Sequence, residues 1–551
     1  MVRLRRRRGL PLLLLAGWAV PLPAQSSTWA LTNARIETVT RGVIERGTIL
    51  IRDGLIAAVG TQVPVPALAV VIDLGGRTVS PGLIALTSTM GIPPAPNTSS
   101  APGEGRGGPG TPGFSSDRMV AGELTGAVDA LKASREAGVT TALVAPDRGM
   151  FRGQSALINM RESLDAKAVV RSPVATHLGY QGVGRGEYPG SLMGVIAAQR
   201  QTLFDAARYG LLMARWDADP RGATRPEHDA KLEALVPAVQ AKMPVFVDAG
   251  NENEIRRAVR LGEEHHLNLT IVGAVEAWRA LDAIKTHQLV VAVNFPRPNQ
   301  VTGWRYSAGI PNDPADSTAR QEAATRLIER NPAAVHASRA RYALASGGTR
   351  GGDFVSNLRK AIAAGLPADA ALAGATIRAA EVAGVAGALG SIETGKIANL
   401  VVSSGPLLSD SAQISMVFVD GARYEVAAKA PARTTAARGA GGGAADATAP
   451  VAVAGTWIIT ANSPQGAMES TLTVTQDGGG VTGTMASEMT GSTPIDNGRV
   501  QGRRFSWSVS LNFGGQSFEV SYVGEVDGNR ITGTVTAGEF GSFTFSGEKR
   551  P

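Results

Sequence analysis

Cysteine is absent from this chain of 551 residues, and histidine occurs only six times. Without cysteine the protein has no disulfide, no thiol nucleophile and no lipid anchor of the kind attached to an N-terminal cysteine. No two histidines have the His-x-His or three-to-four-residue spacing that is typical of a metal site. Aromatic residues make up 5% of the chain while 67 residues are glycine, so small residues and loops are frequent.

The sequence also lacks an apolar run long enough to cross a bilayer. The apolar run Leu10–Val20 is too short for that; it follows five arginines and precedes the small residue Ala24. This pattern predicts a cleaved signal peptide at residues 1–24 and a mature protein in the periplasm or outside the cell, by either general or twin-arginine export. Five of the seven net positive charges lie in this segment, so the remaining chain is nearly neutral and we expect no nucleic-acid partner.

The stretch Ser80–Gly91, SPGLIALTSTMG, separates a strand-rich segment from several hundred residues of mixed pattern. Its Pro-Gly pair interrupts the preceding strand, and Leu83–Leu86 is an apolar run of buried-strand length. On a regular strand, Thr87 and Thr89 point in the same direction. We therefore expect a buried strand that ends with two hydroxyl groups on one face.

Beyond this stretch, predicted helices alternate with predicted strands, which indicates a parallel (β/α) barrel over residues 80–385. The predicted pairs of helix and strand are 117–137 with 139–145, 230–242 with 244–248, 252–266 with 269–273, and 275–287 with 289–294. Inside this barrel, the Pro- and Gly-rich insert 91–116 buries too little apolar surface to order itself. It lies on the barrel's C-terminal face as a disordered excursion or, alternatively, as a lid.

The other segments have different compositions. Residues 25–79 and 386–427 are rich in short strands, with a hairpin signal at Asp53-Gly54. Residues 428–450 form a flexible Ala/Gly/Thr linker. Residues 451–551 alternate apolar and polar positions and predict a small antiparallel β-barrel. One face of that barrel is expected to carry Phe505, Trp507, Val509, Leu511 and Phe513, which favours an aromatic-filled core over a ligand cavity.

The stretch Ser80–Gly91 resembles the first barrel strand of the amidohydrolase superfamily, whose motif reads PGLIDxHxH. The segment 388–425 resembles the closing stretch of the same family, with Asn399 where an Asp is common, and the small C-terminal barrel resembles lipocalin-like domains in its pattern. The family resemblance, to imidazolonepropionase-like metal-dependent hydrolases, covers about 400 residues. It implies a (β/α)8 TIM-like barrel with a composite β-sandwich made from residues 25–79 and 386–427. It also implies zinc or another divalent metal as cofactor.

The same resemblance assigns positions to the metal ligands and the general base. Those positions are occupied by Thr87, Thr89, Asp248, Gly273 and Gly348. Neutral hydroxyls are poor zinc ligands, and a lone carboxylate holds a hard cation weakly. We therefore expect no metal and no confident catalytic residue. Asp248, His177 and Arg297 are candidates for binding a substrate, although structural roles explain His177 and Arg297 more simply.

Two classes of function follow. By resemblance, the protein is a hydrolase of carbon–nitrogen bonds other than peptide bonds. By its residues, it is a catalytically degenerate member that binds a small-molecule or peptide-like ligand, or a partner, through the barrel mouth and the C-terminal domain. Metal-independent hydrolysis around Asp248 is a third alternative.

Overall fold

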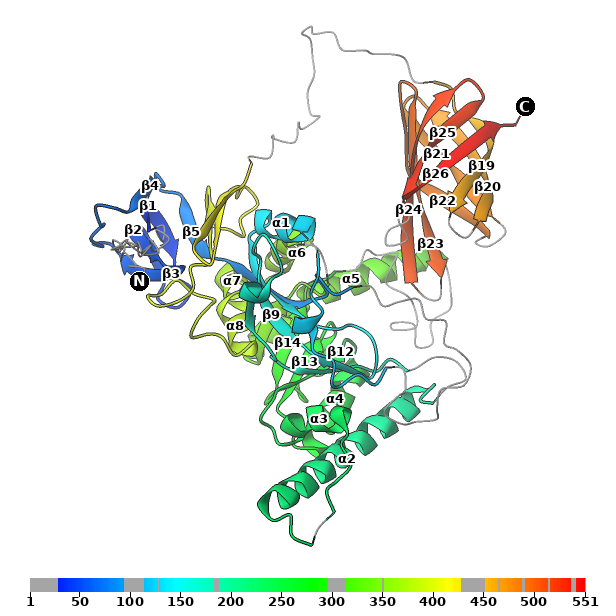
Figure 1. Cartoon of the computed structure of the whole chain (residues 1–551). Coiled ribbons are helices and arrows are strands. Elements are labelled where there is room, and N and C mark those ends of the chain that lie inside the picture. Colours follow the sequence, from blue (N-terminus) through cyan, green and yellow to red (C-terminus); the bar gives the residue numbers. More distant parts are fainter. Residues whose placement is uncertain are drawn as a thin grey trace, which may run out of the picture. The chain divides into compact units, whose positions relative to one another are not determined.

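The computed structural model shows two compact units, which divide between Ala430 and Pro431 (Figure 1). The structure describes residues 28–93, 113–126, 128–182, 188–222, 224–295, 314–348, 351–427, 451–463, 466–487, 491–513, 516–536 and 542–550. The predicted signal peptide, the predicted linker and most of the predicted insert lie outside these residues. Within the described part of the chain, no helix has both the length and the apolar character needed to span a membrane.

One sheet joins the two ends of the first unit. Its eight strands are β1 (Trp29–Glu37), β2 (Val43–Arg52), β3 (Leu55–Gly60), β4 (Val70–Asp73), β5 (Thr78–Pro81), β16 (Leu400–Ser403), β17 (Ile414–Val419) and β18 (Ala422–Glu425). Strand β16 pairs antiparallel with β5, with Val401 opposite Ser80. The strands that follow the barrel therefore pair with those that precede it, although more than 300 residues separate them.

Two tight turns of this sheet contact each other through glycine. The predicted hairpin at Asp53-Gly54 is confirmed, with φ angles of 53° and 79°, and Asp420-Gly421 forms a similar turn between β17 and β18. A Cβ atom on Gly54 would lie 2.9 Å from the Asp420 carbonyl oxygen, and one on Gly421 would lie 2.7 Å from the Gly54 Cα. Glycine thus supplies both the positive φ and the close approach.

A barrel occupies the middle of the first unit. Its strands are β6 (Leu83–Ser88), β7 (Val139–Val144), β8 (Phe151–Gln154), β9 (Ala156–Asn159), β11 (Thr176–Leu178), β12 (Val245–Ala249), β13 (Leu269–Gly273), β14 (Gln288–Ala292) and β15 (Arg341–Ala345); β10 (Val169–Arg171) pairs with β9. Alternate residues such as Ile84 and Leu86, or Ala343 and Ala345, form one buried apolar cluster. Their neighbours Leu83 and Leu344 join a second cluster, which packs against the helices. The interior is therefore filled by side chains.

The prediction of an all-parallel (β/α)8 barrel is wrong at the third strand. After β7 the chain turns within residues 145–150 and returns through β8 and β9, which run antiparallel to β11 and β7 respectively. A turn of this length joins antiparallel neighbours, whereas a parallel crossover needs a dozen or more residues. The strands β12 to β15 are parallel, as predicted. The sequence analysis did not predict β11, which pairs parallel with β12.

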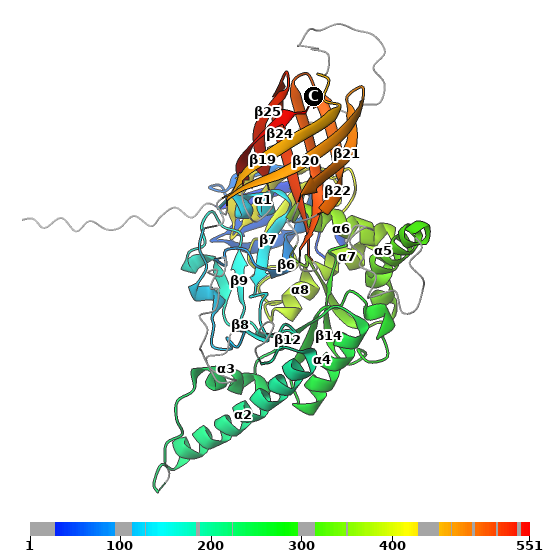
Figure 2. The ribbon, with the colours of Figure 1, turned by 90° about the vertical axis from the view of Figure 1, so that its right-hand side faces the viewer.

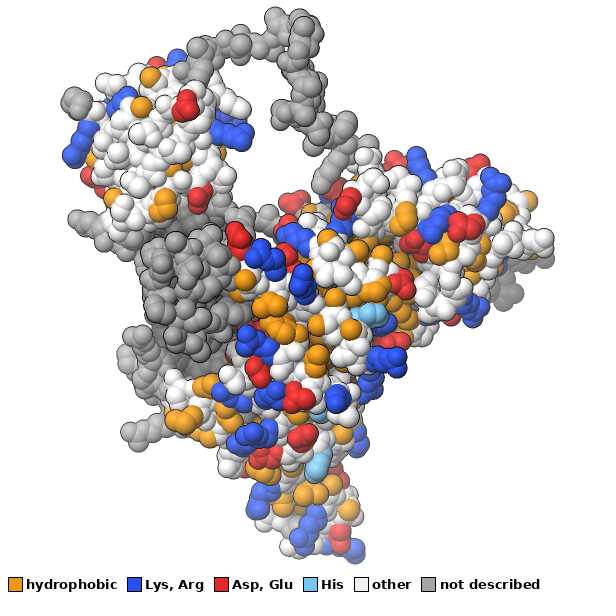
Figure 3. Space-filling view, turned by 180° about the vertical axis from the view of Figure 1, so that it is seen from behind, with side chains coloured by type: hydrophobic (Ala, Val, Ile, Leu, Met, Phe, Trp, Pro, Cys, Tyr) orange, Lys and Arg blue, Asp and Glu red, His pale blue; other side chains and the backbone are white. Residues whose placement is uncertain are grey.

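Helices cover the barrel. They are α1 (Val128–Glu136), α2 (Leu192–Ala218), α3 (Ala230–Val239), α4 (Glu252–Glu264), α5 (Pro314–Ala337), α6 (Gly351–Ala363), α7 (Ala368–Gly374) and α8 (Ile377–Val382), with the 3₁₀ turns η1 (Val120–Gly122), η2 (Ala166–Ala168) and η3 (Ala277–Arg279). The end of α2 projects from the unit in Figures 1 and 2. Acidic and basic side chains are interspersed on the face in Figure 3, with no large area of one charge.

The helix predicted at residues 275–287 is wrong, because the structure has only η3 there. In a helix, the Trp278 N–H would donate to the Ala274 carbonyl oxygen. Instead, the buried side chain of Asn331 on α5 forms hydrogen bonds with both groups. Its Oδ1 accepts from Trp278 N at 3.1 Å, and its Nδ2 donates to Ala274 O at 2.8 Å. A side-chain amide from a helix that the sequence pattern did not reveal thus replaces a helical hydrogen bond.

The end of the predicted insert is ordered. Phe114 is buried, with its ring centroid 4.9 Å from that of Phe151 at a steep interplanar angle. Ser116 is also buried, and its Oγ donates to the Lys231 carbonyl oxygen at 2.7 Å. These two residues were assigned to the insert on composition, which carries no information about long-range contacts.

The second unit is a closed antiparallel barrel. Its strands are β19 (Gly455–Ser463), β20 (Gly466–Asp477), β21 (Gly480–Ser487), β22 (Gly491–Gln501), β23 (Arg504–Phe513), β24 (Gln516–Asp527), β25 (Arg530–Thr536) and β26 (Ser542–Lys549). Phe505, Trp507 and Val509 are buried as predicted, and Trp507 stacks on Tyr522 at 4.9 Å between ring centroids. The side chains of Leu511 and Phe513 lie outside those that the structure describes.

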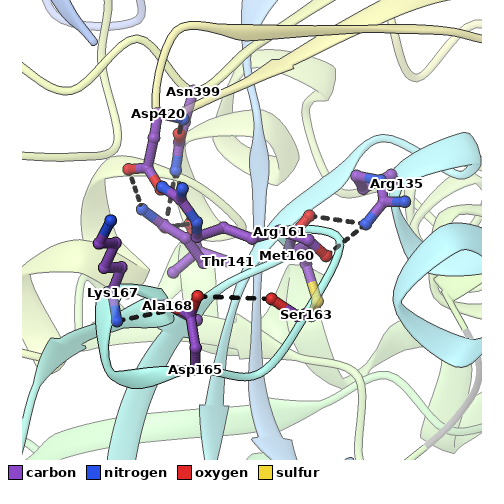
Figure 4. Close-up of polar contacts among 11 residues, drawn as sticks. Arg135, Thr141, Met160, Arg161, Ser163, Asp165, Lys167, Ala168, Asn399 and Asp420 are labelled. Carbon is purple, nitrogen blue, oxygen red and sulfur yellow. Dashed lines mark hydrogen bonds and ion pairs between the residues drawn. The ribbon is translucent and has the colours of Figure 1, made fainter. Parts of the chain in front are cut away.

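A buried polar network fastens the barrel to the sheet (Figure 4). Asn399 Nδ2 donates to Thr141 Oγ1 at 3.0 Å and to Asn159 Oδ1 at 2.8 Å. Asn159 Nδ2 donates to Asp420 Oδ1 at 2.6 Å, and the Asp420 backbone N–H donates to Asn399 Oδ1 at 2.8 Å. Arg161 neutralises the other carboxylate oxygen of Asp420 at 2.9 Å. Asn399 is needed here as a donor, a role that the Asp common in the family motif cannot fill while ionised.

We therefore expect Asn399→Asp to destabilise the protein by roughly 1–3 kcal/mol, because Thr141 Oγ1 and Asn159 Oδ1 each lose the hydrogen bond that Asn399 donates. The substitution also places a carboxylate beside Asp420. Urea unfolding followed by circular dichroism measures this change. Asn268→Asp is the matched control, since the Asn268 side chain is exposed. Equal stability of the two variants would contradict the role given to Asn399.

Candidate functional site

Strand β6, the first strand of the barrel, ends in a bulge. Its register against β7 shifts between Ala85 and Ser88. Thr87 adopts a φ of 64°, which is rare for a β-branched residue, and its Oγ1 donates to the Leu86 carbonyl oxygen at 2.6 Å. Thr87 is half-buried whereas Thr89 is exposed. The regular alternation predicted for these two threonines is therefore wrong, because the bulge interrupts it.

A buried ion pair lies where β8 meets the C-terminal ends of the parallel strands. Arg152 Nη1 on β8 is 3.0 Å from Asp248 Oδ2 on β12. The Arg152 side chain is 7% exposed and that of Asp248 is 48% exposed. The pair thus has a buried cation and an accessible carboxylate, so Asp248 is the member that a ligand can reach.

Two glycines give this pair its room. A Cβ atom on Gly179 would lie 2.1 Å from Arg152 Nη2, so only glycine leaves space for the guanidinium there. Gly273, at the end of β13, has a φ of 90°, and a Cβ on it would lie 3.2 Å from Asp248 Oδ1. The absence of a side chain at Gly273 therefore has a local structural reason: it accommodates Asp248.

His177 on β11 lies beneath the ion pair. It is buried, and its ring centroid is 5.2 Å from that of Phe246 on β12. Burial, followed by the nearby charge of Arg152, lowers the pKa of His177 to about 3. Its Nε2 atom is buried and has no hydrogen-bond partner within the described part of the chain. His177 is therefore neutral near neutral pH, and its Nε2 has no solvent access.

The eighth strand ends in small residues. Ser346 is buried, and its Oγ donates to the Leu86 carbonyl oxygen at 3.2 Å, which joins β15 to β6. A Cβ atom on Gly347 would lie 2.6 Å from Asn294 Cγ. Gly348 follows with a φ of 81° and is exposed. Arg297 lies outside the described residues.

The structure thus brings two of the sequence candidates, Asp248 and His177, together around Arg152. The sequence analysis missed Arg152. The sequence carries little signal for it, because Arg152 follows Phe151 but precedes Gly153 and Gln154, a pattern not typical of a strand. The predicted alternation of helices and strands gave no reason to place a strand at residues 151–154, so Arg152 was not considered as a site residue.

Comparison with known proteins agrees with a barrel architecture for the first unit. Residues 230–424 match the model of the amidohydrolase family. The solved structure of an amidohydrolase from Thermotoga maritima superposes with a TM-score of 0.59 and 21% sequence identity, over 72% of this chain and 99% of that one. The part of the first unit from residue 230 to residue 424 thus matches the amidohydrolase family. The resemblance seen in the sequence is thus confirmed, and the structural likeness supports a TIM-barrel domain.

Other solved structures align with this chain over similar lengths. A putative prolidase from Bifidobacterium longum shows 18% identity over 72% of this chain and 94% of its own, with a TM-score of 0.46. An adenosine deaminase from Xanthomonas campestris with bound zinc shows 16% identity over 73% and 93%, with a TM-score of 0.38. No curated protein sequence matches the chain.

The family's metal site does not fit the residues at this barrel mouth. Across the described residues, no three or more His, Asp or Glu side chains converge. The ligand and base positions that the resemblance assigns are held by Thr87, Thr89, Gly273 and Gly348 as well as Asp248. Asp248 already bonds a guanidinium, and a divalent ion at its carboxylate would be repelled by that fixed charge. The donor set present is therefore unsuited to a divalent metal.

The pKa of His177 predicts a pH dependence of stability. The unfolded chain binds a proton at this residue below about pH 6.5, whereas the folded protein does so only below about pH 3. Stability therefore falls as the pH drops through this window, by at most about 1.4 kcal/mol per pH unit. Between about pH 7 and about pH 5, we expect the parent to lose about 2 kcal/mol more than His177→Gln does.

Urea unfolding at the two pH values measures this difference. His228→Gln is the control, because the His228 side chain is 70% exposed. If His177→Gln loses as much stability on acidification as the parent does, then His177 is not a neutral buried group.

Proposed function

We propose that the barrel of this amidohydrolase-superfamily protein binds a small molecule and does not catalyse metal-dependent hydrolysis. The observation that supports this most directly is the ion pair between Arg152 and Asp248. The guanidinium supplies the positive charge that compensates Asp248, the one carboxylate among the assigned ligand positions. A catalytic metal would have to displace Arg152, which is nearly buried and has little room to move.

The ligand that suits this mouth carries hydrogen-bond donors. An accessible charged group at this mouth is the Asp248 carboxylate, which is held in place through Oδ2. An ionised carboxylate is an acceptor only, so its complement is an amine, an amide N–H or a hydroxyl. A peptide-like compound with a free amine meets this requirement. The second unit, with its aromatic core, accompanies the barrel as a lipocalin-like module.

Metal analysis of the full-length protein, purified after growth with zinc, manganese and iron, tests the proposal. We expect far less than one metal ion per chain and no hydrolysis of dipeptides or cyclic imides. Thr87→His combined with Thr89→His should also stay metal-poor, because Gly273 and Gly348 still supply no ligand. The pair Thr87→Ser and Thr89→Ser is the matched control. Stoichiometric metal in the parent would overturn the proposal.

We also propose that the protein is exported. This rests on the arginine cluster, the short apolar run and the small residues that end at Ala24. N-terminal sequencing of the mature protein from its source should begin close after Ala24. A mature chain that retains Leu10–Val20 would contradict cleavage.

A further inference from the structure

A second cleft lies between the sheet and two helices of the first unit, apart from the mouth residues described above. Its walls are the turn between β1 and β2, the helices α6 and α7, and the loop 406–410. The cleft has a volume of about 820 Å³. This volume lies within the range of small-molecule sites, which is about 300–1,000 Å³.

Apolar side chains dominate the lining of this cleft. They are Val39, Val43, Ile362, Ala363, Ala368, Leu372, Pro406, Leu407 and Leu408. Val43 is 45% exposed although it is a large hydrophobic residue, whereas Leu407 and Leu408 are buried. The surface therefore suits a ligand with an apolar body of moderate size.

One buried donor atom in the cleft lacks a hydrogen-bond partner among the described residues. Arg359 of α6 lines the cleft, and the Arg359 Nε atom is buried without a hydrogen-bond partner. Within the described residues, no ion pair or hydrogen bond of this side chain is found. A buried guanidinium nitrogen left unsatisfied is costly, because arginine remains charged at any ordinary pH.

The acidic residues of the cleft do not meet this need. Glu37 Oε1 accepts from Arg35 at 2.7 Å and its Oε2 accepts from Ser80 Oγ at 2.9 Å, so both of its carboxylate oxygens are engaged. Asp369 and Asp410 are exposed at the rim. The acidic residues of the cleft therefore leave Arg359 Nε free to bond a group from outside the chain.

The backbone beside the cleft is strained. Val39 has a φ of 72°, a conformation that β-branched residues rarely adopt. The turn is held by Thr38, whose Oγ1 donates to the Gly42 carbonyl oxygen at 2.7 Å and accepts from the Arg41 N–H at 2.9 Å. Such strain is typical of functional sites, where surrounding contacts maintain it. Here it places the Val39 side chain in the lining.

We propose that this cleft binds an amphipathic carboxylate: an apolar chain against the aliphatic lining, and a carboxylate paired with Arg359. An isolated aliphatic ligand would leave the guanidinium uncompensated, and a small anion would leave the apolar lining exposed. The combination of one anionic head and one apolar tail satisfies both surfaces.

Isothermal titration of the full-length protein with dodecanoate tests this site. We expect saturable binding at one molecule per chain, and no comparable binding of acetate or of dodecyltrimethylammonium, which has the same tail but a cationic head. Arg359→Met keeps the apolar stem but removes the charge, and should weaken dodecanoate binding by about tenfold or more. Val43→Asp adds a negative charge at the rim and should weaken it as well.

Lys360→Met is the matched control, because Lys360 is the next residue of α6, is exposed and does not line the cleft. It should bind dodecanoate like the parent. The proposal is overturned if the parent does not bind dodecanoate, if dodecyltrimethylammonium binds equally well, or if Arg359→Met keeps the parental affinity. The last result would place any binding elsewhere, including in the second unit.

Discussion

A buried guanidinium must be compensated, and this constraint governs the mouth of the barrel. Arg152 reaches Asp248 because the third strand runs antiparallel and carries its first residues to the end where the parallel strands finish. The guanidinium fits because residue 179 is glycine, and the carboxylate fits because residue 273 is glycine. The same charge helps to keep His177 neutral. The strand reversal and the two glycines thus accommodate one ion pair, while burial is the main cause of the low pKa of His177.

The contact between the barrel and the sheet depends on hydrogen bonds between buried polar side chains. Thr141, Asn159 and Asn399 are all buried; Asn399 donates to both of the others, and Thr141 also donates to Asn159. Asp420 completes the network, and its backbone lies in the turn that contacts Gly54. The sheet is therefore fixed against the barrel by directional bonds, which set the register of the C-terminal strands in a way that apolar contact alone would not.

Local sequence signals predicted the parts of this fold that depend on local chemistry. The Asp53-Gly54 turn, the strands β12 to β15 and the alternating second unit follow from residue periodicity and turn residues. The antiparallel third strand, the loss of the helix at 275–287 and the burial of Phe114 depend on distant partners, such as Asn331 and Phe151. Asp248 and His177 were predicted from family positions and chain location. That both residues lie close to Arg152 could not be predicted, because it depends on the antiparallel direction of β8.

Two arginines in this unit show why one structure supports two different sites. Arg152 and Arg359 both place guanidinium atoms in buried surroundings, but Arg152 has a carboxylate within 3.0 Å and Arg359 has no such partner in the described chain. At the mouth, the charges of Arg152 and Asp248 therefore compensate each other without a ligand. Asp248 still offers a hydrogen-bond acceptor. The cleft beside α6 places the unpartnered Nε of Arg359 beside aliphatic side chains. The two proposed ligands accordingly have opposite chemistries: hydrogen-bond donors at the mouth, and an anion with an apolar tail in the cleft.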